Sequence, residues 1–162
     1  MMPTAPSSRP CFLADAMLSR LARWLRVLDF DTYFDPEVDD PELVRLADRE
    51  RRILLTRDRH LVTHLQPQRS VLVVHDKPLD QLRQVIEACR LEPPPALFVR
   101  CAVCNTPLRD ARDDEIAAHM PARSRSLPGT VSRCPGCLRM YWPGSHTWRM
   151  RATLEAALPG WL

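Results

Sequence analysis

The sequence has a single lysine, no long apolar run and no apolar segment near its N-terminus. A transmembrane helix needs about 20 consecutive apolar residues, so we expect no membrane-spanning segment and no membrane partner. Residues 1–10 are polar and rich in proline, whereas a secretory signal peptide has an apolar centre. We therefore expect a disordered tail at residues 1–10 and a cytoplasmic protein.

The composition is that of a folded chain with an uneven charge. Of the 162 residues, 45% are hydrophobic, which is enough to bury a core. Up to Phe98 there are 14 basic and 15 acidic residues, a net charge of −1, whereas from Val99 onward there are 9 and 5, a net charge of +4. Nearly all of the basic residues are arginine. This excess fits either a coding bias or contact with phosphate groups, which the planar guanidinium binds well.

Residues 11–92 alternate between short apolar runs and amphipathic segments. Continuous apolar strands separated by helices are typical of a parallel sheet covered on both faces. In the first helix, Arg20, Arg23 and Arg26 lie opposite the apolar face, which predicts that they are solvated. We expect strands at Phe12–Ala14, Thr32–Phe34, Ile53–Leu55 and Val71–Val74, and helices at Ala16–Leu28, from Pro41, at Asp58–Leu65 and around Leu82–Cys89.

A proline-rich linker at residues 93–97 separates this region from a smaller domain, residues 98–162, which we expect to end in a helix. The smaller domain holds few aliphatic residues but contains Cys101, Cys104, Cys134 and Cys137 in two Cys-x-x-Cys pairs. Four thiolates on two tight turns can enclose a structural zinc ion. An iron–sulfur cluster and redox-active dithiols are the alternatives, and a disulfide framework does not suit a reducing compartment.

Three carboxylates occupy positions at which parallel sheets bind ligands. Asp15 follows the first strand, Asp58 follows the third, and Asp40 begins a helix. Carboxylates gathered at one sheet edge bind Mg²⁺ or Mn²⁺, and such an ion can activate water for attack on a phosphodiester. The alternative is that these residues only form turns and cap a helix. Arg20, Arg23 and Arg57 are candidates to hold substrate phosphates.

The chain resembles the Mut-seven carboxy-terminal ribonuclease domain family, a branch of the PIN-like nucleases. Residues 12–28 resemble its opening motif, residues 39–43 its second acidic element and residues 53–61 its Thr-Arg-Asp element. The two Cys-x-x-Cys pairs and residues 141–146 resemble its appended zinc ribbon. Asp29 stands where the family usually has glycine.

The resemblance implies a PIN-like α/β/α domain over residues 11–92 and a zinc ribbon within residues 98–162. It also implies that Asp15, Asp40 and Asp58 bind catalytic Mg²⁺ or Mn²⁺ and that RNA is the substrate. Asp76, after the fourth strand, is a weaker candidate for a fourth carboxylate.

We therefore expect a metal-dependent ribonuclease whose zinc ribbon helps to bind single-stranded RNA, with Tyr141 and Trp142 available for stacking. The alternative is a non-catalytic RNA-binding or adaptor protein with a vestigial acidic site.

Overall fold

The computed structural model describes residues 9–162, so residues 1–8 of the expected tail lie outside it. The structure describes Arg9 of that tail, whose guanidinium pairs with Asp29 at 3.1 Å and lies 4.2 Å from the ring centroid of Phe30. Within residues 9–162, no helix has both the length and the apolar character to span a bilayer.

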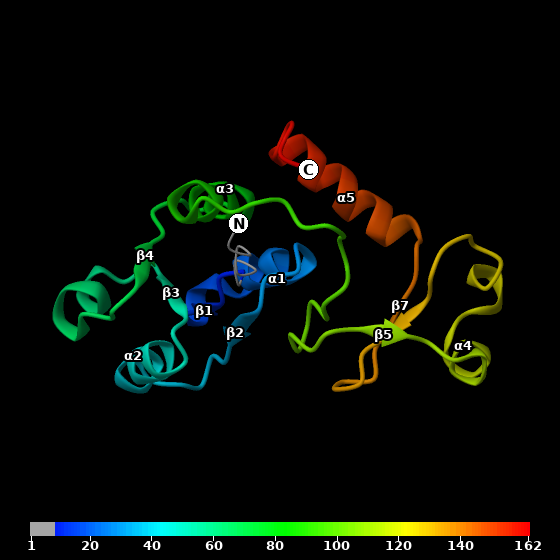
Figure 1. The fold of residues 1–162 in the computed structure, drawn as a ribbon, viewed down its shortest axis with the longest axis horizontal. Helices are drawn as coiled ribbons and strands as arrows, with labels where there is room; N and C mark the ends of the chain where they lie inside the picture. Colours follow the sequence, from blue (N-terminus) through cyan, green and yellow to red (C-terminus); the bar gives the residue numbers. More distant parts are fainter. Residues whose placement is uncertain (1–8) are drawn as a thin grey trace, which may run out of the picture.

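The first part of the chain forms a parallel four-stranded sheet in the order β2-β1-β3-β4 (Figure 1). Apart from a fourth strand that begins and ends earlier than expected, the strands lie where the apolar runs predict. The elements are β1 (Phe12–Ala14), η1 (Ala16–Leu18), α1 (Ser19–Val27), β2 (Thr32–Phe34), α2 (Asp40–Arg49), β3 (Ile53–Thr56), η2 (Leu61–Leu65), β4 (Ser70–Leu72) and α3 (Pro78–Cys89).

Alternate residues of the central strands face opposite sides of the sheet and form two apolar layers. Phe12 and Leu55 pack with α1 and α3, whereas Leu13 and Leu54 pack with α2 and η2. Helices therefore cover both faces of the sheet. The expected fold class, α/β with three layers and a mostly parallel sheet, is confirmed.

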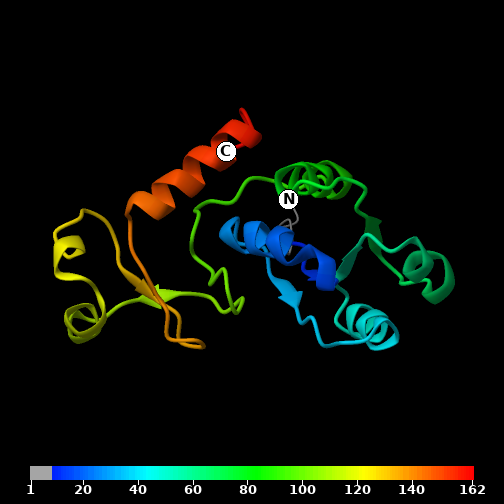
Figure 2. The ribbon, with the colours of Figure 1, turned by 180° about the vertical axis from the view of Figure 1, so that it is seen from behind.

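The C-terminal part carries a small antiparallel sheet in the order β5-β6-β7 and a long final helix. Figures 1 and 2 show this final helix, α5, crossing from the small sheet back toward α3, against which it packs. Leu154 and Leu158 of this segment join the apolar layer of α1 and α3. The elements are β5 (Arg109–Asp110), α4 (Asp113–His119), η3 (Ala122–Ser124), β6 (Ser132–Arg133), β7 (Met140–Tyr141) and α5 (Ser145–Ala157).

Arg26 differs from the expectation that it is solvated, because only 5% of it is exposed. Its Nε donates to the carbonyl oxygen of Thr32, and its Nη1 donates to those of Ala102 (3.3 Å) and Val103 (2.8 Å). The first Cys-x-x-Cys turn covers this end of α1, and the arginine supplies donors to the backbone carbonyls of that turn. Arg20 and Arg23, earlier on the same helix, are exposed as predicted.

Candidate functional sites at the cysteine cluster and the acidic edge

The four predicted cysteines form one cluster. Their Sγ atoms all lie within 4.8 Å of one another, with 3.6 Å between Cys101 and Cys137 and 3.3 Å between Cys104 and Cys134. These separations exceed the S–S bond length of about 2 Å, and all four cysteines are free. Four sulfur donors at this spacing can bind a metal ion such as zinc.

Each Cys-x-x-Cys turn aims a backbone N–H at its own first sulfur. The N–H of Cys104 donates to Cys101 Sγ at 3.5 Å, and that of Cys137 donates to Cys134 Sγ at 3.4 Å. Such bonds stabilise thiolates and orient them toward a shared cation. The C-terminal cluster therefore has the donor set and local geometry of a zinc ribbon.

The thiols of the cluster influence one another's ionisation. Burial opposes ionisation of Cys104, but hydrogen bonds with Thr106 and the neighbouring cysteines lower its pKa to about 6. Burial and hydrogen bonds with the other three cysteines raise the pKa of Cys137 to about 12. Four thiolates so close together repel one another unless a cation neutralises them.

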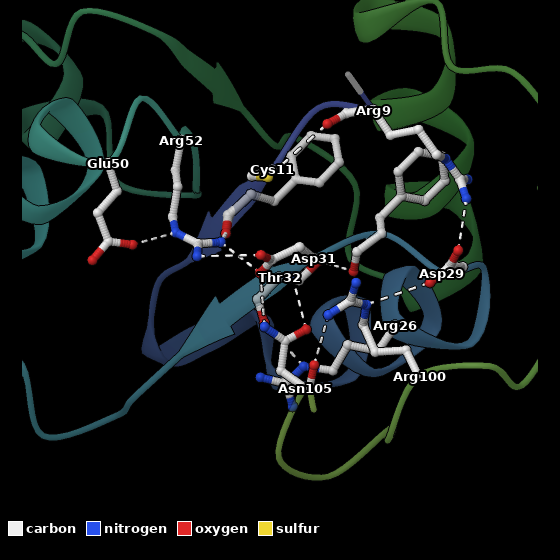
Figure 3. A network of polar contacts seen from close by, with 12 residues as sticks. Arg9, Cys11, Arg26, Asp29, Asp31, Thr32, Glu50, Arg52, Arg100 and Asn105 are labelled. Atoms are coloured by element: carbon white, nitrogen blue, oxygen red, sulfur yellow. Dashed lines mark hydrogen bonds and ion pairs between the residues drawn. The ribbon is translucent and has the colours of Figure 1, made fainter. Parts of the chain in front are cut away.

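A polar network joins the first Cys-x-x-Cys turn to the parallel sheet (Figure 3). The side chain of Asn105, which directly follows Cys104, donates to Asp31 Oδ1 at 2.8 Å and accepts from the N–H of Thr32 at 3.0 Å. Asp31 also accepts from Arg52 at 2.7 Å. Burial alone would raise the pKa of Asp31, but the hydrogen bonds from Arg52 and Asn105 lower it, so the carboxylate stays ionised.

The predicted carboxylates all lie at or near the carboxyl edge of the parallel sheet, but they differ in environment. Asp15 is 7% exposed, whereas Asp40 and Asp58 are exposed. Asp39 rather than Asp40 caps α2, because its side chain accepts from the N–H of Glu42 at 2.9 Å. Asp40 is the first residue of the helix, so its carboxylate is not the capping group.

Thr56 connects Asp15 to Asp58. Its hydroxyl donates to Asp15 Oδ2 at 2.5 Å and accepts from the N–H of Asp58 at 3.0 Å. Asp15 also accepts from the N–H groups of Met17 and Arg57, at 2.9 and 3.1 Å. The Thr-Arg-Asp element at the end of β3 thus fixes the Asp15 carboxylate, which directly follows the neighbouring strand β1. The sequence alone does not indicate this role for Thr56.

The three carboxylates do not form a compact group like that of the cysteines. Among residues 9–162, the four cysteines are the only set of three or more potential ligands whose donor atoms all lie within 4.8 Å. Arg57, a candidate for phosphate binding, pairs instead with Asp76 at 2.5 Å. The carboxylate of Asp76 is largely exposed, so this pair is open to exchange with a ligand.

The donor chemistry of the acidic edge suits a hard divalent cation. Mg²⁺ is commonly bound by one or two carboxylates and keeps several waters, so it does not need a closed cage. Among the described residues, the side chain of Asp58 accepts one hydrogen bond, from the N–H of His60, which leaves its other oxygen available. Asp15 and Asp58 could therefore hold such an ion.

No curated protein and no solved structure is significantly similar to the chain. A protein-family model does match it: the model described as the Mut7-C RNAse domain covers residues 10–154, which include both the acidic edge and the four cysteines. This match spans nearly the whole sequence and agrees with the parallel sheet and the cysteine cluster. The chain therefore belongs to the Mut7-C RNAse domain family.

Proposed function

We propose that this protein is a metal-dependent ribonuclease that hydrolyses RNA phosphodiesters at the carboxyl edge of the parallel sheet. The observation that carries the proposal is the Thr56 bridge of a Mut7-C domain: the Thr56 hydroxyl binds the Asp15 carboxylate, which follows β1, and the backbone N–H of Asp58, which follows the adjacent strand β3. When bound, Mg²⁺ or Mn²⁺ would supply a polarised water and positive charge for the phosphodiester.

The residues of the chain have separate roles in this proposal. Asp15, Asp40 and Asp58 are the catalytic carboxylates that bind the divalent ion. Asp15 is the most firmly placed of them, because it accepts three hydrogen bonds. Arg20, Arg23 and Arg57 would hold phosphate oxygens, Arg57 by exchanging its partner Asp76 for the substrate.

The four cysteines have a structural role. We propose that they bind zinc, which leaves no open coordination position and therefore takes no part in hydrolysis. The excess of basic residues after Val99 supports RNA as the partner of this domain.

The test compares Asp58→Asn with the wild-type protein in cleavage of labelled single-stranded RNA. Because Asp58 is exposed, the substitution should leave the fold intact while removing a charged ligand. We expect the wild type to cleave only after Mg²⁺ or Mn²⁺ is added to zinc-loaded, otherwise metal-free protein. Asp58→Asn should be slower by about 100-fold or more, since loss of metal-based charge stabilisation costs several kcal/mol.

Glu87→Gln is the matched control, because Glu87 is exposed near the C-terminal end of α3, at the opposite end of that helix from the loop that follows β4. It should cleave at the wild-type rate. If Asp58→Asn cleaves RNA as fast as the wild type, the acidic edge is not the active site. If no added metal supports cleavage by the wild type, the non-catalytic adaptor hypothesis replaces the ribonuclease.

A further inference from the structure

A groove of about 810 Å³ lies between α1 of the sheet domain and the C-terminal domain. Its walls come from α1, from η3 and its neighbours, from β7 and from the first turn of α5. Parts of the chain that are distant in sequence therefore line one concave surface.

Basic side chains line the groove. Arg23, Arg123 and Arg139 contribute three guanidinium groups, and His119 and His146 contribute two imidazoles, whereas no aspartate or glutamate of the described residues lines the groove. None of the ion pairs between residues 9 and 162 involves these three arginines. Arginines that are exposed and not paired with carboxylates can bind phosphate groups without first losing a partner.

The same groove contains aromatic side chains. Trp148 is 55% exposed, which is unusual for the largest apolar side chain, and the half-buried Trp142 also lines the groove. Trp142 is held close to the backbone, because its Nε1 lies 3.3 Å from where a Cβ on Gly144 would stand. Indole rings and arginines that line one groove are a combination that binds single-stranded nucleic acids, in which the bases are free to stack.

We propose that this groove binds single-stranded RNA, with backbone phosphates on Arg23, Arg123 and Arg139 and bases stacked on Trp148 and Trp142. The negative phosphates complement the positive charge of the unpaired arginines, and unpaired bases can stack on the exposed indole of Trp148. The inference rests on the proposed function, because it gives the path by which the substrate reaches the acidic edge.

Helix α1 connects the groove to the acidic edge. Figures 1 and 2 show α1 pointing from the parallel sheet toward the C-terminal domain. Arg23 lines the groove, the exposed Arg20 lies one turn earlier, and Asp15 immediately precedes η1. Helical rise places Arg23 about 12–14 Å along this path from Asp15. RNA that leaves the groove along α1 would therefore pass Arg20 and reach the carboxylates.

The experiment measures binding of a fluorescein-labelled oligouridylate of about 12 nucleotides, a length that spans one binding site. Zinc-loaded protein is used without Mg²⁺ or Mn²⁺, and binding is followed by fluorescence anisotropy. Trp148→Ala should raise the Kd about tenfold, whereas Trp148→Phe should retain most of the affinity because the phenyl ring still stacks.

The double substitution Arg123→Ala/Arg139→Ala tests the role of the arginines in phosphate binding. It should weaken binding and reduce the slope of log Kd against log salt by about 1.4, because each phosphate of a single strand that an arginine neutralises adds about 0.7 to that slope. Arg149→Ala is the matched control, because Arg149 is an exposed arginine of α5 that does not line the groove. It should bind RNA nearly as the wild type does.

The outcomes separate this inference from the proposed function. If the groove variants bind RNA like the wild type while Asp58→Asn abolishes cleavage, the groove assignment is wrong and the ribonuclease stands. If the groove variants lose binding while Asp58→Asn cleaves normally, the groove assignment stands and the active-site assignment fails. Two further results would overturn the groove assignment. In the first, double-stranded RNA binds as tightly as single-stranded RNA and Trp148→Ala has no effect. In the second, the protein binds oligoglutamate through these arginines but does not bind RNA.

Discussion

The parallel-sheet part and the cysteine-containing part of the molecule bury very different side chains. The sheet and its helices enclose two layers of aliphatic and aromatic residues. Between residues 99 and 144, the buried side chains are mainly Cys101, Ala102, Met120, Cys134 and the charged Glu115. A region with so little apolar burial needs another source of stability, and the two regions should therefore respond differently to loss of metal.

Glu115 shows how polar groups replace an apolar core in the cysteine-containing part. Only 4% of it is exposed, and it accepts two hydrogen bonds from Arg109, one from Arg133 and one from the N–H of Arg112. The hydrogen bonds from Arg109 and from the Arg112 backbone hold the pKa of Glu115 well below its usual value. Its stabilising effect is thus present at neutral pH and is lost only in acid, as pH falls through this lowered pKa.

The largest difference between the two regions should follow loss of one thiolate. Cys134→Ser removes a buried ligand, so zinc should be released and the cysteine-containing part should unfold. Structural zinc sites supply apparent binding free energies of about 10–16 kcal/mol, which become folding free energy. Zinc content measured by mass spectrometry and a thermal melt followed by circular dichroism would show both effects, with the sheet retained.

Cys11→Ser is the control for that experiment, because Cys11 lies outside the cluster. It should keep the full zinc content and melt within a few degrees of the wild type. A Cys134→Ser protein with stoichiometric zinc and an unchanged melt would mean that the four sulfurs do not bind the ion together.

The junction between the two regions should have an intermediate effect. Arg26→Met keeps the apolar stem but leaves the carbonyl oxygens of Thr32, Ala102 and Val103 without their donor. We expect a loss of about 2–4 kcal/mol in unfolding free energy, since buried unsatisfied groups each cost about 1–3 kcal/mol. Zinc should also be released faster to a chelator, because the turn that carries Cys101 and Cys104 loses its support.

Arg20→Met on the exposed face of α1 controls for loss of charge and should change the free energy by no more than about 0.5 kcal/mol. Urea unfolding measures both variants. Equal effects of the two substitutions would show that Arg26 does not join the regions.

The local patterns of the sequence predicted more than its distant contacts. Each Cys-x-x-Cys pair contains, within four residues, two sulfur atoms and the N–H that donates to the first of them. The spacing alone therefore predicted the cluster. The strands were predicted from apolar runs, but β4 ends at Leu72 and not at Val74. The N–H of Val73 still donates to the carbonyl oxygen of Thr56 in β3, whereas Val74 is exposed.

Contacts between distant segments could not be predicted in this way. Arg26 has the spacing of a solvated residue, and its burial depends on a turn 76 residues later. Asn105 and Asp31 are 74 positions apart, and nothing in either neighbourhood indicates the other. Whether Asp15, Asp40 and Asp58 bind one ion likewise depends on how three separate loops meet, so their catalytic role stays a prediction.

The smallest predicted effect concerns Asp29, which follows α1 and touches both regions. Its φ of 61° is left-handed, which explains why the family usually has glycine in this turn. Its carboxylate pairs with Arg9 at 3.1 Å and with Arg100, at the start of the cysteine-containing part, at 3.5 Å. Asp29→Gly should therefore relieve backbone strain and lose two partly exposed ion pairs, each worth about 1 kcal/mol or less.

These two effects oppose each other, so we expect the unfolding free energy of Asp29→Gly to lie within about 1 kcal/mol of the wild type. Asp29→Asn separates them, because asparagine tolerates the left-handed conformation but carries no charge. The Asn variant reports the ion pairs, and the further change from Asn to Gly reports mainly the backbone. A loss above about 2 kcal/mol in both variants, measured by urea unfolding, would show that Asp29 joins the two regions as strongly as Arg26 does.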